Sequence, residues 1–248
     1  MQAAQRIRDA VAQVTLQRQR CADDAELMQA LAQVKQLQAL RFAASYADLL
    51  AAGPYREAAQ FFLDELYGDK DFTQRDQQFA RIAGALQRVF PHEVVATAVA
   101  LSQLHALTET LDFSMSQAWL RLGSAQTLDD ASRYVGAWRE VGRTDERNTQ
   151  LREVLALGRE MEQLTRTPGL RLMLRMMRAP ATAGGLGELQ RFLESGFDHF
   201  AGMARKQGLT AEFLAIIEQR ESRWINRLFE LEPVACATEL AAALGQAR

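Results

Sequence analysis

Cysteine, proline and histidine are all scarce in this chain of 248 residues, which holds two, five and three of them respectively. The two cysteines, Cys21 and Cys236, stand far apart and outside any metal-ligand spacing, so the sequence predicts neither a disulfide framework nor a zinc site. This cysteine usage fits a reducing compartment. Three histidines are also few for acid–base chemistry.

A strong net charge and long apolar runs are missing as well. The formal net charge of −2 argues against attraction of the whole protein to nucleic acid, so no nucleic-acid partner is expected. No run of about 18 apolar residues occurs, and residues 1–13 lack the apolar core of a signal peptide. We therefore predict a cytoplasmic protein without a transmembrane segment.

The familiar catalytic motifs are absent too. The sequence contains no nucleophile elbow, no Walker loop and no HExxH helix. The glycine-rich run at 184–187 follows no predicted strand and has no Lys-Ser or Lys-Thr pair, so it matches no nucleotide fingerprint. These absences favour a non-enzymatic protein, although a site assembled from scattered residues would leave no such motif.

Helical periodicity is present along almost the whole chain. Apolar residues recur at spacings of three and four, and no segment alternates with the period of a strand. We predict an all-α protein, a multi-helix bundle of about nine to eleven helices without a sheet. Polarity rises sharply after Gly142, which divides an N-terminal helical region, 1–142, from a C-terminal one, 145–248, packed together as one compact unit.

The most distinctive stretch is 61–76, FFLDELYGDKDFTQRD. An apolar helix end precedes Gly68, which suits a left-handed cap, and an acidic turn leads into a new helix. This pattern predicts a tight helix–loop–helix corner. Four charged residues there form either a structural clamp, with a half-buried ion pair between the last two, or an interaction surface: Asp69, Asp71, Arg75 and Asp76.

A calcium loop is the alternative that the corner's spacing suggests. Asp69, Asp71 and Thr73 occupy its first three ligand positions. The sixth position is Gln74 where the turn needs glycine, and the twelfth is Ala80 where the ion needs a bidentate glutamate. No metal is expected here.

The corner and its surroundings resemble a family of uncharacterised bacterial proteins marked by an FFLxxLYGxxDFxxRD signature. The resemblance covers residues 36–115 and rests on the corner and on three flanking segments, LRF at 40–42, YADLL at 46–50 and LHALTE at 104–109. It implies relatedness and a cytoplasmic bacterial origin. It implies no activity, cofactor or catalytic residue.

The segment 94–107 is apolar almost all round, which predicts the central helix of the fold. The helix carries His105 and, one turn later, Glu109, a pair whose shared face can bind a metal. With Phe62 and Tyr67 they would line a pocket for a small ligand, haem or metal. The alternative is a packing histidine bonded to a neighbour, and the Glu-x-x-His pairs of di-iron bundles are absent.

A second candidate surface is the segment 170–178, LRLMLRMMR. Arg171, Arg175 and Arg178 share one face of a helix, and Leu and Met residues fill another. Such a helix binds anions or partners, or simply packs; nine residues are too short to hold a membrane surface alone.

Three functions remain open at this point. We favour a non-enzymatic interaction or regulatory protein that uses the corner or the basic helix, with a protein partner or self-association. The second is a ligand-binding bundle with its pocket near His105, whose cofactor, if any, the sequence does not identify. The third is an enzyme that uses His105 with Glu109, or Arg75 with Asp76.

Overall fold

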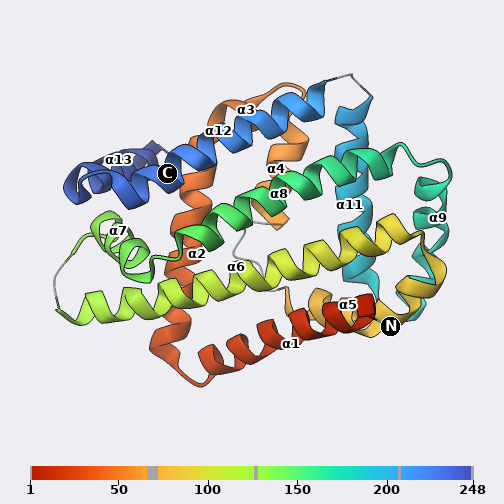
Figure 1. Ribbon diagram of the computed structural model, residues 1–248, viewed down its shortest axis with the longest axis horizontal. Helices are drawn as coiled ribbons and strands as arrows, with labels where there is room; N and C mark the ends of the chain where they lie inside the picture. Colours follow the sequence, from red (N-terminus) through yellow and green to blue (C-terminus); the bar gives the residue numbers. More distant parts are fainter. Residues whose placement is uncertain (1, 66–71, 126–127, 206–207, 247–248) are drawn as a thin grey trace. The chain divides into compact units, whose positions relative to one another are not determined.

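A computed structural model describes residues 2–65, 72–125, 128–205 and 208–246 (Figure 1). These residues form helices and no strand, which confirms the all-α prediction. The helices are α1 (Gln2–Ala22), α2 (Ala25–Ser45), α3 (Ala47–Ala51), α4 (Arg56–Glu65), α5 (Thr73–Val89), α6 (His92–Ala125), α7 (Asp130–Val141), α8 (Thr144–Thr165), α9 (Leu170–Met176), α10 (Arg178–Ala183), α11 (Gly187–Ala204), α12 (Leu209–Glu230) and α13 (Pro233–Gln246).

The predicted count of nine to eleven helices is wrong, because the described residues contain 13. The sequence pattern does not resolve the short helices: α3 has five residues and α10 has six. Both follow a neighbouring helix after a single intervening residue, Tyr46 or Met177. A periodic apolar pattern continues across such a break, so pattern alone merges the two helices.

Local chemistry explains several helix ends. Asp24 is the N-cap of α2, and its carboxylate accepts a hydrogen bond from the backbone N–H of Leu27 at 3.0 Å. Asp129 caps α7 in the same way through Ser132. Gly53 and Gly169 take φ values of 98° and 79°, a region that favours glycine, and they separate successive helices.

The chain forms two compact units that interleave along the sequence. The first unit comprises Met1–Thr15, Asp71–Ala106 and Arg152–Ala215, and the second comprises Leu16–Lys70, Leu107–Leu151 and Ile216–Arg248. This division differs from the sequential halves expected from the polar run after Gly142, since that run lies inside the second unit. Helices α1, α6, α8 and α12 each contribute residues to both units.

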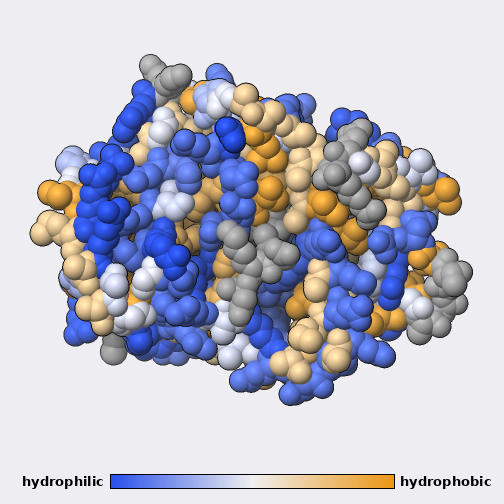
Figure 2. Space-filling view, turned by 180° about the vertical axis from the view of Figure 1, so that it is seen from behind, coloured by the Kyte–Doolittle hydropathy of each residue, from blue (hydrophilic) through white to orange (hydrophobic). Residues whose placement is uncertain are grey.

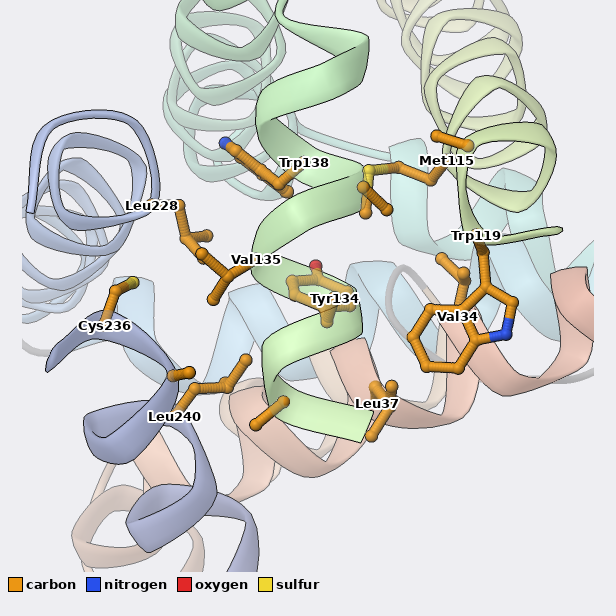
Figure 3. Packing of buried hydrophobic residues seen from close by; sticks show 14 of the residues in the cluster. Val34, Leu37, Met115, Trp119, Tyr134, Val135, Trp138, Leu228, Cys236 and Leu240 are labelled. Atoms are coloured by element: carbon orange, nitrogen blue, oxygen red, sulfur yellow. The ribbon is translucent and has the colours of Figure 1, made fainter. Parts of the chain in front are cut away.

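The core of the second unit is centred on α7. Figure 3 shows Tyr134 of α7 on the side of Val34 and Trp119, and Val135 on the side of Leu228 and Cys236. All six of these side chains are at most 1% exposed. Because α7 is covered from both sides, α2, α6, α12 and α13 form one continuous apolar core with it.

The first unit has smaller apolar clusters. One joins the beginning of α1 to α5, α6 and α11, with Ile7 and Ala83 at its centre. Another joins α8, α9 and α11 through Leu164, Leu174 and Phe197. This second cluster fixes which side of α9 faces inward.

Helix α6 is continuous over 34 residues. By length and composition its segment His92–Gly123 is able to cross a bilayer, the one such segment among the described helices. Of its most apolar window, 44% is buried inside the structure, and its Glu109 bonds to Lys35. Buried core helices meet the same criterion, so the described helices include no clear transmembrane segment.

Candidate functional site

The structure unites residues from two of the predicted sites, the corner and the ligand pocket. Asp76, in the first turn of α5, lies 2.8 Å through Oδ2 from Nε2 of His105 on α6. Its other oxygen lies 3.8 Å from Nε of Arg75. All three side chains are largely shielded, with 18% of His105 exposed. The carboxylate therefore fixes the orientation of the imidazole.

Aromatic rings enclose Arg75 in this cluster. Its guanidinium carbon lies 3.9 Å from the ring centre of Phe72 and 4.5 Å from that of Phe192 on α11. The Phe72 ring also meets His105 edge-on at 6.3 Å. Cation–π contacts of this kind contribute roughly 0.5–2 kcal/mol each, so Arg75 fastens the start of α5 to α11.

Two kinds of partner bear on catalysis or metal binding at this cluster, a nucleophile beside His105 and a set of metal ligands. Within the described ranges, His105 forms no hydrogen bond to a hydroxyl or thiol group. The same ranges contain no group of three His, Cys, Asp or Glu side chains placed to hold a metal ion. A carboxylate-oriented imidazole can still accept or donate a proton.

Of the other members of the predicted pocket and corner, the structure describes Phe62 and Glu109. Tyr67, Asp69 and Asp71 lie outside the described residues. Phe62 is buried in the second unit. Glu109 also belongs to that unit, where Nζ of Lys35 donates to it at 2.7 Å, whereas His105 belongs to the first unit. The two residues of the predicted pair therefore have different partners: His105 contacts Asp76, and Glu109 contacts Lys35.

The three predicted arginines lie together beside α11, and we call them, with their two carboxylate partners, the arginine face. Arg171 pairs with Asp198 at 2.8 Å. Arg178 binds both carboxylate oxygens of Glu194, with Nε at 2.7 Å from each. The Arg178 guanidinium holds the pKa of Glu194 below its usual value, and Glu194 raises the pKa of Arg178. Arg175 lies between them along the chain and lines the same small surface pocket.

The outward side of α9 is apolar. Leu172 and Met176, one turn apart, are 63% and 69% exposed, while Leu170 and Leu174 are buried on the inward side. Figure 2 shows one face of the molecule as largely hydrophilic, with apolar areas interrupted by polar side chains. Among the described residues, Leu172 and Met176 are the two exposed large apolar side chains that lie one turn apart on the same helix.

A further polar site, inside the second unit, is absent from the sequence predictions. Three side chains of α2, spaced three residues apart, each bind an acidic residue of another helix. We call this set the polar ladder: Lys35, Gln38 and Arg41 on α2, Glu109 and Asp112 on α6, and Glu221 on α12. The signal that sequence reasoning could have used is the pair of acidic residues Glu109 and Asp112 in the middle of a helix rich in apolar residues.

The rungs of the polar ladder have short distances. Gln38 Nε2 donates to Asp112 at 2.9 Å. Arg41 binds both oxygens of Glu221, at 3.2 and 2.8 Å, and the Tyr46 hydroxyl donates to Glu221 at 3.0 Å. Both partners of the Arg41–Glu221 pair are 7% exposed. A buried bidentate pair with an added hydroxyl donor has its charges well compensated.

Burial dominates the protonation chemistry around the ladder. It raises the pKa of Asp112 above the usual carboxyl range, against the opposing effect of Lys35 and Arg147. Burial likewise raises the pKa of Tyr134, and that of the Cys21 thiol, which Glu109 raises further. Asp112 is thus a buried carboxyl group that favours its neutral form more than an exposed one does.

Comparison with known proteins identifies a family. A family model described as "Domain of unknown function (DUF8198)" matches residues 17–235, which is most of the chain. The chain belongs to the DUF8198 family. The matched range includes residues 36–115, where the resemblance to an uncharacterised family was found. No curated protein and no solved structure matches this DUF8198 chain.

Proposed function

We propose that this DUF8198 protein is a non-enzymatic interaction protein that binds a protein partner through α9. The exposed pair Leu172 and Met176 carries the proposal, because the two side chains form an apolar anchor point of the kind that helical partners contact at i and i+4. The arginine face beside them supplies cationic groups. Arg and Met are enriched where proteins bind each other.

The test compares assemblies purified from the organism that makes the protein. We expect the native chain to migrate with a partner, and the double variant Leu172→Ser with Met176→Ser to lose it. The variant's free energy of unfolding should stay within about 0.5 kcal/mol of the native value, because both side chains are exposed. Val89→Ser, at a position that is 60% exposed on α5, is the matched control. Retention of the partner by the double variant would contradict the proposal.

A second candidate function is proton-transfer chemistry or small-ligand binding at the His105–Asp76 pair. The observation that favours it is the oriented, partly exposed imidazole. In that case His105→Gln would abolish turnover or ligand binding while leaving thermal stability close to native. Loss of stability alone would assign His105 to helix packing.

We also propose a cytoplasmic location. Both cysteines are buried free thiols, which agrees with a reducing environment. Fractionation of the source cells tests this, and recovery in a secreted or membrane fraction would contradict it.

A further inference from the structure

Three side chains share the outward side of α9, and we call them the α9 facet: Leu172, Arg175 and Met176. Their spacing of three and four residues places them together on one side of the helix. Arg175 is exposed, like its two apolar neighbours. The facet therefore offers an incoming molecule two apolar contacts and one guanidinium group within about a turn of helix.

The three arginines at and beside the facet differ in whether they already form an ion pair. Asp198 and Glu194 of α11 hold Arg171 and Arg178 in ion pairs. In the part of the chain that the structure describes, no carboxylate forms an ion pair with Arg175. Its positive charge does act on Glu194, whose pKa it helps to lower. Arg175 is thus the arginine of this face that can bind an external carboxylate without breaking an existing pair.

We infer that the partner bound by the α9 facet is an amphipathic helix that carries an Asp or Glu within its apolar stripe. This inference rests on the proposed function and adds the partner's chemistry to it. The apolar residues of the partner would cover Leu172 and Met176, and its carboxylate would reach Arg175. A charge-assisted bond from guanidinium to carboxylate is favourable once the surrounding apolar contact excludes water.

Other occupants fit the facet less well. A second copy of the chain would bring Arg175 of one copy close to Arg175 of the other, and like charges repel. A basic segment would meet the same repulsion. A membrane surface would gain only two apolar side chains from a helix of seven residues, too few for stable anchoring. Methionine at the facet suits a helical partner because its flexible side chain adapts to varied shapes.

The test places a photoreactive p-benzoylphenylalanine in the full chain instead of Met176, in cells of its source organism. The control chain carries the same group instead of Val89, an exposed apolar position on α5 in the same unit. Mass spectrometry of the crosslinked peptide then reads which segment lies on the facet. We expect a protein segment with helical apolar periodicity and an Asp or Glu within four residues of the crosslinked side chain.

Charge reversal decides whether that carboxylate binds Arg175. Arg175→Glu should lower the crosslink yield about tenfold, and a Lys replacing the partner's acidic residue should restore it in this variant. Arg191→Glu, on an arginine that is 73% exposed on α11, should leave the yield unchanged. Unfolding curves of both variants show whether the fold is retained. If Arg175→Glu unfolds the chain, Arg175→Gln takes its place, with an expected loss of yield in the same direction.

The outcomes separate the two proposals. Yields at positions 176 and 89 that do not differ, or a crosslink within the chain itself, would overturn both. A crosslink to a basic or uncharged protein segment, or no rescue by the charge swap, would leave the interaction function standing and overturn the acidic-helix inference. A crosslink to lipid would replace both with binding at a membrane surface.

Discussion

The Arg178–Glu194 pair of the arginine face and the Arg41–Glu221 pair of the polar ladder join the same chemical groups, guanidinium and carboxylate, in different surroundings. Arg178 is 60% exposed as it binds Glu194, whereas Arg41 is 7% exposed as it binds Glu221. Solvent reaches the Arg178 side of the first pair, while Glu194 is 15% exposed and also accepts a hydrogen bond from Gln190. Both members of the second pair are buried, so similar geometry is open to solvent on one side in the first unit and enclosed in the core of the second.

The largest effect on stability is expected when one carboxylate of the polar ladder is removed. Glu221→Ala would leave the buried Arg41 without its bidentate partner and Tyr46 without its acceptor. We expect a loss of about 3–5 kcal/mol in the free energy of unfolding, measured by urea denaturation. The double variant Arg41→Met with Glu221→Leu removes both charges and should lose less than the single variant. An effect below about 1 kcal/mol for Glu221→Ala would show that solvent reaches the pair.

The next effect concerns the pH dependence of stability, to which the buried carboxyl group of Asp112 contributes. The folded-state pKa of Asp112 is raised, so the native chain loses stability as pH rises through the window from the ordinary Asp pKa to the folded value. Asp112→Asn cannot ionise and should gain stability relative to the native chain as pH rises across that window.

Asp129 supplies the control of opposite sign for this experiment. Bonds from the Ser132 backbone N–H and hydroxyl lower its pKa, so its stabilisation is present above the ordinary Asp pKa and is lost as pH falls through the folded value. Asp129→Asn should therefore lose relative stability as pH rises. Urea titrations from pH 3 to pH 8 measure both variants, and slopes of the same sign would contradict the assignment.

The smallest effect on stability is expected for the Arg178–Glu194 pair, whose arginine is 60% exposed. Glu194→Gln removes the ion pair with Arg178, and we expect less than about 1 kcal/mol of lost stability. Raising the salt concentration to 1 M should shrink the difference further, since exposed charges are screened. Thermal melts at both salt concentrations provide the measurement. A loss as large as that of Glu221→Ala would end the distinction between the two regions.

Local signals in the sequence were enough for the fold class and for some helix ends. The helical spacing of apolar residues and the cap at Asp24 depend on neighbours within one turn, so the sequence predicts them directly. The pairs Lys35–Glu109 and Arg41–Glu221 join residues 74 and 180 positions apart, and no periodicity reports such partners. The interleaved units escaped prediction for a related reason: α6 passes from one unit to the other within a continuous helix, where composition marks no boundary.

The three-residue spacing of the ladder side chains on α2 determines which neighbouring helix each side chain faces. Each step of three residues turns about 300°, which is about 60° short of a full rotation, so successive side chains wind slowly around the helix. The first two therefore meet α6, at Glu109 and Asp112, and the third has turned far enough to meet Glu221 on α12. If α2 slid or rotated by one residue, all three side chains would lose their acidic partners at the same time. The polar ladder therefore selects one register of α2 relative to α6 and α12.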